Sequence, residues 1–247
     1  MNSVGLIGFG RFGKVLTNVL RKGFSIKVFD LMTQPLFPGV DFVDLDAVLM
    51  EKVIFIAVPI SHFETVVADI APKFSNETTI IDVCSVKIHP VDVMKNYLPD
   101  SVGIIATHPM FGPDSFMSNQ RLKMMMNNTR DTHHQFDFWK GFFTDQGIQI
   151  LEMTPDHHDE LAAQTQGVTH FLGRMLKEFG IRKTSIDTQG FRDLLDLVDQ
   201  TCNDTWELYT DLQFYNPYTK AMIENLKQAT ETLDRQLMDM HRETMEN

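Results

Sequence analysis

A glycine-rich turn near the N-terminus is the feature that most restricts the fold of this 247-residue chain. Gly8, Gly10 and Gly13 form a G-x-G-x-x-G pattern, which follows the apolar run 4–7 and precedes a helical stretch to about Arg21. Glycines recur by chance, so the pattern alone is weak evidence. Between a strand and a helix, however, it is typical of a dinucleotide-binding βαβ unit. We therefore expect a Rossmann-type domain at the start of the chain.

Short apolar runs alternate with helical stretches over the first 152 residues. The runs are continuously apolar, as expected of strands that are covered on both faces. The predicted strands are 4–7, 25–29, 53–58, 79–83, 103–106, 122–126 and 148–152. This alternation indicates an α/β fold with a doubly wound, mainly parallel sheet.

The chain changes character after Pro155, and no convincing strand follows from Asp159 onward. The pattern predicts three long helices, at 159–180, 189–213 and 217–245, with Pro217 in the first turn of the last one. We therefore expect two domains, a dinucleotide-binding domain at 1–152 and an all-helical substrate and dimerisation domain at 153–247.

The charge of the chain disfavours some partners and is unevenly distributed. A net charge of −11 argues against nucleic acid, whose phosphates have the same sign. Residues 151–247 carry nine Lys and Arg against eighteen Asp and Glu, a net charge of −9. No apolar run has the roughly 18–20 residues of a membrane helix. Without signal-peptide features either, a cytoplasmic protein is expected, with Cys84 and Cys202 as free thiols.

The glycine turn and the end of the second predicted strand together predict the cofactor. We expect the whole turn to contact a dinucleotide, through Gly8, Phe9, Gly10, Arg11, Phe12 and Gly13. Asp30 ends the second strand, where a carboxylate accepts hydrogen bonds from the adenosine ribose and repels a 2′-phosphate. NAD is therefore expected, with NADP less favoured. The structural alternatives are a tight turn without a ligand and an aspartate that ends its strand for local reasons.

The carboxyl ends of the later strands are expected to supply the chemistry, as is usual in this fold. Val58 and Pro59 follow the third strand and are expected to lie along the cofactor. His108 follows the fifth strand, where an imidazole beside a nicotinamide can take a proton from a substrate hydroxyl. Ser85, after the fourth strand, is expected to hydrogen-bond the same region and to contact the cofactor. Lys87 in the same run is as readily structural as functional.

Two histidine pairs, His133-His134 and His157-His158, raise the question of a metal site. Adjacent histidines on a helix or loop point apart, and no carboxylates or cysteines stand at ligand spacing from them. We therefore interpret both pairs as surface histidines and expect no metal.

The motifs resemble those of the prephenate and arogenate dehydrogenases of tyrosine biosynthesis. The resemblance is carried by 8–13, by 82–87 and especially by the His-Pro-Met-Phe-Gly-Pro run at 108–113. It continues at 164–174, at Gly190-Phe191 and at 214–217, is closest to the plant arogenate-type members, and covers nearly the whole chain. It implies that His108 hydrogen-bonds the ring hydroxyl of the substrate and that Ser85 helps to orient it.

The resemblance also points to the helical domain for substrate binding. It implies roles for His170 and for Arg174, the latter as a carboxylate anchor. Gln166 is spaced four residues before His170, and Arg174 four after, so all three are expected on one helix face. A solvated polar stripe is the alternative. Many bacterial members carry a substrate-binding arginine where this chain has Asp196, which leaves Arg174 or a residue of the partner subunit to hold the ring carboxylate.

The activity implied by the resemblance is NAD-dependent oxidative decarboxylation of prephenate or arogenate by a homodimer formed through the helical domain. Arogenate carries one net negative charge against two for prephenate, so the acidic helical domain and Asp196 favour arogenate. One alternative is another two-domain Rossmann dehydrogenase, of β-hydroxyacid or imine reductase type. Such enzymes use a lysine that does not stand out in 159–180. The other is a non-catalytic cofactor-binding dimer, which need not keep His108 and Ser85.

Overall fold

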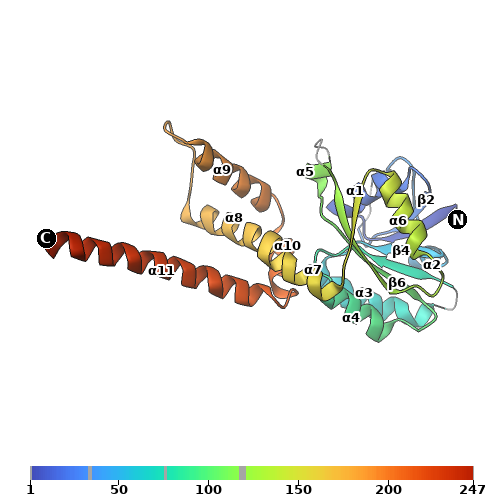
Figure 1. Ribbon diagram of the computed structural model, residues 1–247. Helices are drawn as coiled ribbons and strands as arrows, with labels where there is room; N and C mark the ends of the chain where they lie inside the picture. Colours follow the sequence, from blue (N-terminus) through green and yellow to red (C-terminus); the bar gives the residue numbers. More distant parts are fainter. Residues whose placement is uncertain (1, 33–34, 75–76, 117–120, 247) are drawn as a thin grey trace. The chain divides into compact units, whose positions relative to one another are not determined.

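The computed structural model describes residues 2–32, 35–74, 77–116 and 121–246 (Figure 1). The chain divides into two compact units, Met1–His158 and Asp159–Asn247, and each is described by itself. The predicted boundary follows residue 152, where the last strand ends, whereas the division into compact units follows His158.

The first unit is built on one eight-stranded sheet. Its order is β3-β2-β1-β4-β5-β6-β7-β8, and every neighbouring pair is parallel except β6 and β7. The strands are β1 (Ser3–Ile7), β2 (Ser25–Phe29), β3 (Val40–Phe42), β4 (Val53–Ile56), β5 (Thr79–Asp82), β6 (Gly103–Pro109), β7 (Lys123–Arg130) and β8 (Gln149–Glu152). The predicted doubly wound, mainly parallel sheet is therefore confirmed.

Two strands differ from the prediction. The strand β3 was not predicted, because this half-exposed edge strand of three residues is too short to show hydrophobic periodicity. The strand predicted at 122–126 extends to Arg130 as β7 and runs antiparallel to β6. Its second half is polar and only partly buried, so the apolar pattern ended before the strand did.

Helices cover the sheet and enclose the core. They are α1 (Arg11–Leu20), α2 (Leu45–Leu49), α3 (Ile60–Ile70) with the short η1 (Ala71–Lys73), α4 (Ile88–Tyr97), α5 (Pro113–Phe116) and α6 (Phe136–Asp145). The helices α3 and α4 pack side by side (Figure 1). Side chains of α1 and α6 share one hydrophobic cluster with the sheet, in which the buried Trp139 meets Phe55 edge-to-face at 5.0 Å.

The second unit consists of helices over its described residues, 159–246. The helix α7 (Pro155–Ala162) continues through a π-helical segment, η2 (Ala163–Gly167), into α8 (Val168–Phe179). It is followed by α9 (Gln189–Cys202), α10 (Trp206–Phe214) and α11 (Thr219–Glu246). None of the described helices combines the length and the hydropathy that a membrane crossing requires.

The prediction of a single helix at 189–213 is wrong, because the chain turns between α9 and α10. Thr205 caps the second piece, its hydroxyl accepting a hydrogen bond from the Leu208 amide at 3.1 Å. The last helix begins at Thr219, so Pro217 precedes it and is not in its first turn. The preceding Asn216 is buried and donates to the Asp159 carbonyl at 2.8 Å, which secures that turn.

The helices α8 and α9 are in close contact at Gly173. A Cβ atom at that position would lie 2.0 Å from the Thr201 hydroxyl oxygen, so only glycine permits this approach. Arg174, described below, is the next residue on α8.

Candidate active site

The glycine turn between β1 and α1 has the geometry that the sequence pattern predicts. Gly8 has a φ of +96°, and a Cβ there would lie 2.5 Å from the Ala57 carbonyl oxygen. A Cβ on Gly13 would lie 2.5 Å from the Gly8 carbonyl oxygen, so helix and strand approach closely. At Gly10 a Cβ would meet nothing within 4 Å. The turn is therefore open at Gly10 and tightly packed against neighbouring backbone at Gly8 and Gly13.

Asp30 ties the end of β2 to this turn. Its carboxylate accepts hydrogen bonds from the Phe9 amide at 2.6 Å and from the Met32 amide at 2.8 Å. The Phe9 ring is buried and packs edge-to-face on Phe37 and Phe42, so this predicted cofactor residue has a packing role through its side chain. Arg11 is exposed and begins α1.

The surroundings of the turn suit an anionic ligand. The N-terminus of α1 has no capping side chain and no acidic residue in its first turn, so the positive end of the helix dipole can face an anion there. Val58 lies at the edge of the turn, with its Cγ1 3.2 Å from a Cβ placed on Gly8, and Pro59 is the N-cap residue before α3. The strands β1 and β4 are neighbours here, at the point where the strand order reverses. The residues thus fit a dinucleotide phosphate.

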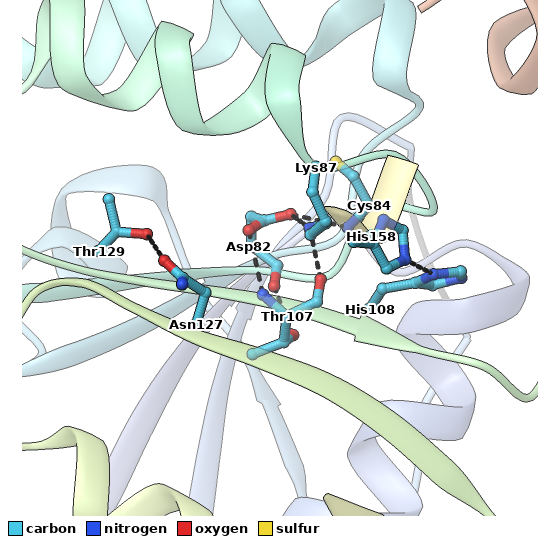
Figure 2. Close-up of polar contacts among 8 residues, drawn as sticks. All are labelled: Asp82, Cys84, Lys87, Thr107, His108, Asn127, Thr129 and His158. Atoms are coloured by element: carbon cyan, nitrogen blue, oxygen red, sulfur yellow. Dashed lines mark hydrogen bonds and ion pairs between the residues drawn. The ribbon is translucent and has the colours of Figure 1, made fainter. Parts of the chain in front are cut away.

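His108 lies near the carboxyl end of β6 and is 5% exposed. Its Nδ1 is hydrogen-bonded to Nε2 of His158 at 2.8 Å, with the two rings nearly perpendicular (Figure 2). The prediction that His158 is a surface histidine is therefore wrong, since this side chain is 4% exposed. His157, its neighbour on α7, is exposed.

The surroundings keep the His108 ring neutral. Burial lowers its pKa well below 6.5, and the nearby His158 and Lys87 lower it further. A neutral imidazole has one nitrogen that can accept a proton, so His108 is in the form that a general base requires.

A buried ion pair joins the ends of β5 and β6 beside Thr107, the residue before this histidine (Figure 2). Lys87 and Asp82 are both fully buried, and the Lys87 ammonium also contacts the Thr107 carbonyl. Asp82 accepts hydrogen bonds from the amides of Cys84 at 3.0 Å and Thr107 at 3.2 Å. Burial raises the pKa of Asp82, and Lys87 opposes that shift. Of the two interpretations left open for Lys87, the geometry supports a structural role.

Ser85 lies in the turn after β5 that this ion pair holds, and β5 is the neighbour of β6. Its hydroxyl oxygen is buried and, within the described part of the chain, has no hydrogen-bond partner. A buried polar atom without a partner is uncommon in folded proteins and often marks a place that a ligand completes.

Arg174 on α8 is surrounded by α10 and the turn before it. Its Nη2 donates to the Asp204 carbonyl at 2.6 Å, and the guanidinium lies over the rings of Trp206 and Tyr209 at 5.5 and 5.4 Å. Its Nε is buried and has no partner among the described residues. The helical unit therefore holds a fixed cation whose buried Nε donor is unused among the described residues.

The other two predicted substrate-binding residues also have buried polar atoms that lack a hydrogen-bond partner among the described residues. Gln166 Oε1 and His170 Nδ1 are buried without partners among the residues that the structure describes. Burial lowers the pKa of His170, with Asp204 opposing and Arg174 adding to the shift. Gln166 lies in the π-helical segment, a distortion often found at functional sites.

Gln213 on α10 was missed by the sequence analysis. Its Nε2 donates to the Gly167 carbonyl at 3.1 Å, which identifies the other end of the amide as the oxygen, since a carbonyl can only accept. That oxygen, Oε1, is buried without a partner in the described part of the chain. Nothing in the local sequence distinguishes this glutamine, because the residue that its side chain contacts, Gly167, is 46 positions away in the sequence.

The remaining candidates lie apart from these groups. Asp196 is exposed on α9. His133 contacts the Ser101 carbonyl at 2.8 Å, and His134 is exposed. Over the described ranges, no three His, Cys, Asp or Glu side chains gather as metal ligands.

Two family models match the chain. Residues 39–129 match the model "Prephenate dehydrogenase, nucleotide-binding domain", and residues 175–247 match "TYRAAT1-like, C-terminal domain".

Curated relatives match along most of the chain. Arogenate dehydrogenase 2, chloroplastic, of Arabidopsis thaliana is 31% identical over 251 residues, which cover 95% of this chain and 69% of the relative. Arogenate dehydrogenase 1, chloroplastic, of the same plant is also 31% identical, and the match covers 95% of this chain but only 39% of that longer protein.

A solved structure shares the fold. Prephenate dehydrogenase from A. aeolicus, in complex with hydroxyphenyl propionate and NAD+, superposes with a TM-score of 0.75 at 17% identity. The match covers 98% of this chain and 92% of that one.

Proposed function

The chain belongs to the prephenate and arogenate dehydrogenase family, and we propose that it catalyses the NAD-dependent oxidative decarboxylation of a cyclohexadienol. The observation that carries this proposal is the neutral, buried His108 at the carboxyl end of β6. The glycine turn follows the carboxyl end of β1, and therefore lies at the same end of the parallel strands as His108.

We propose that the glycine turn holds NAD. Gly10 leaves room for the pyrophosphate, the N-terminus of α1 faces its charge, and Asp30 binds the adenosine ribose. Val58, Pro59 and Ser85 would line the rest of the cofactor. When bound, NAD supplies the acceptor for a hydride from the carbinol carbon.

The side chains at the ends of β5 and β6 then act on the substrate hydroxyl. His108 removes its proton as the C–H bond breaks, and the Ser85 hydroxyl orients the same oxygen. The ring carboxylate leaves as carbon dioxide, its electron pair enters the ring, and the product oxygen regains a proton as a phenol. Aromaticity drives this step, so the protein needs only to orient and polarise the hydroxyl.

We propose that the unfilled polar atoms of the helical unit bind the substrate's charged groups. Arg174 Nε and His170 Nδ1 suit a carboxylate. The buried oxygens Gln166 Oε1 and Gln213 Oε1 can only accept hydrogen bonds. An ammonium group satisfies them, whereas the keto oxygen of prephenate offers no donor. Arogenate is therefore the favoured substrate, in line with the net charge of −9 on residues 151–247.

Turnover of the two substrates tests this function. We expect the highest kcat/KM with arogenate and NAD, measured at matched ionic strength against prephenate and against NADP. A tenfold preference for prephenate, equal to about 1.4 kcal/mol of transition-state binding, would overturn the arogenate assignment. Absence of turnover with either substrate would contradict the dehydrogenase function itself.

The choice of NAD over NADP is expected to depend on the charge of Asp30. Asp30→Asn should narrow the ratio of kcat/KM for the two cofactors, because the repulsion of a 2′-phosphate is lost. The amide oxygen can still accept one of the two hydrogen bonds, from Phe9 or from Met32, whereas Asp30→Ala loses both hydrogen bonds along with the charge. A wild-type protein that prefers NADP would show that Asp30 does not select the cofactor.

We propose a homodimer formed through the helical unit, because that unit exposes many large apolar side chains. They are Leu161, Met175, Phe179, Ile186, Leu194, Trp206, Phe214, Leu233, Leu237, Met238, Met240 and Met245. Along α11, Leu233, Leu237 and Met240 recur at helical spacing and form one apolar stripe.

Light scattering at micromolar concentration is expected to give twice the chain mass of 28.4 kDa. The double variant Leu233→Glu with Leu237→Glu should be monomeric, since it places charges in the apolar stripe. Leu36→Glu, at an exposed leucine of the first unit, is the matched control and should remain dimeric. A monomeric wild type would refute the proposal.

A further inference from the structure

The contact between His108 and His158 bears on which nitrogen of His108 carries its proton. A neutral imidazole exists in two tautomers, and the hydrogen bond made by one nitrogen determines the state of the other. Nδ1 of His108 is engaged with Nε2 of His158 at 2.8 Å. Nε2 of His108 is therefore the nitrogen left for a substrate.

We propose that His158 is a positioning residue that holds His108 in the Nδ1–H tautomer by accepting its hydrogen bond. His158 then has its own proton on Nδ1, and Nε2 of His108 keeps a lone pair for the substrate hydroxyl. In the opposite arrangement, His158 donates from Nε2 and His108 has its proton on Nε2. That tautomer cannot take up a proton at the nitrogen facing the substrate.

The packing holds both rings in place. His108 and His158 are 5% and 4% exposed, and their ring centroids lie 4.9 Å apart at an angle of 81° (Figure 2). The His158 amide donates to the Thr154 carbonyl at 3.0 Å, which fixes the start of α7. Both rings are therefore held at hydrogen-bonding distance, and the tautomers of the two rings decide which of them donates.

The electrostatic setting favours a neutral His108 ring, because the ring is buried. The Lys87 ammonium, from the turn after β5, disfavours a positive charge on the nearby His108 ring. A carboxylate in the place of His158 would stabilise the imidazolium, whereas a neutral acceptor fixes the tautomer without doing so.

The tautomer can be observed directly by NMR. In ¹⁵N-labelled protein, long-range ¹H–¹⁵N correlations should show His108 with a protonated Nδ1 and an unprotonated Nε2. In His158→Leu the proton is expected to move to Nε2 in a large fraction of molecules. His158→Gln keeps an acceptor oxygen near the same place and should retain the wild-type pattern. The control His157→Leu changes the exposed neighbour and should leave the His108 signals unaltered.

Kinetics give the second measurement, and this part rests on the proposed function. His158→Leu should lower kcat by about 10²-fold, at the low end of the effect of a general base, with the Kd for NAD unchanged. His158→Gln should stay within a few-fold of wild type. A merely structural role predicts no such rescue.

The outcomes separate the two proposals. A wild-type His108 protonated at Nε2 would overturn the role of His158, whatever the activity. So would an unchanged tautomer and kcat in His158→Leu. A wild type with the Nδ1–H tautomer that turns over neither arogenate nor prephenate would leave the tautomer assignment standing and refute the dehydrogenase function.

Discussion

Replacing His108 with alanine is expected to lower kcat by about 10²–10⁴-fold, the usual contribution of a general base. The substitution removes the group that accepts the hydroxyl proton and leaves the glycine turn intact. The Kd for NAD, measured by fluorescence or calorimetry, should therefore barely change. An unchanged kcat would remove His108 from the mechanism.

The pH dependence gives an independent check on this residue. Burial, His158 and Lys87 hold the pKa of His108 well below 6.5. The base form is therefore present at neutral pH, and kcat/KM should decline only as the pH falls through that lowered pKa. His108→Ala should lack this acidic decline. His133→Ala, which changes a half-buried histidine in the turn before α6, is the matched control and should keep both the rate and the decline.

Most of the sheet could be predicted because each strand is marked by its own local run of apolar residues. Runs such as 53–58 and 103–106 are continuously apolar, as strands between two helical layers must be. The break between α9 and α10 was missed because no glycine or proline marks it. It depends on the Thr205 cap and on Arg174, which binds the Asp204 carbonyl from 30 residues away. Such a contact leaves no trace in local periodicity.

The candidate site likewise has parts that could be predicted from local sequence and parts that depend on contacts between residues far apart in the sequence. The shape of the turn at Gly8 and Gly13 follows from short-range sterics and was predicted by pattern alone. The place of His158 depends on how α7 packs against the end of β6, 50 residues away in sequence. One signal was available: His158 lies four residues before the buried Ala162 and so on the apolar side of its helix, unlike the exposed His157.

Lys87→Met is expected to destabilise the protein by about 3–5 kcal/mol, because it leaves the Asp82 carboxylate buried without its counter-charge. For a unit of this size the midpoint of thermal unfolding should fall by roughly 10 °C. The activity should fall as well, since the ion pair ties the Ser85 turn to the strand that carries His108. Calorimetry at neutral pH and the kcat of the folded variant measure the two effects.

The loss of stability should itself depend on pH, with a defined sign. Burial already raises the pKa of Asp82, and without Lys87 nothing of comparable strength opposes that shift. A carboxyl whose folded pKa lies above its unfolded value favours the folded state at low pH, and this contribution is lost as the pH rises through the folded pKa. The deficit of Lys87→Met relative to wild type should therefore be small in acid and grow toward neutral pH. Adding Asp82→Asn removes the buried charge and keeps one oxygen, which can accept a hydrogen bond from only one of the two amides, Cys84 or Thr107, that the carboxylate oxygens bind, so the double variant should regain part of the stability. An equal deficit at every pH, or no recovery in the double variant, would show that Lys87 acts through its packing and not through its charge.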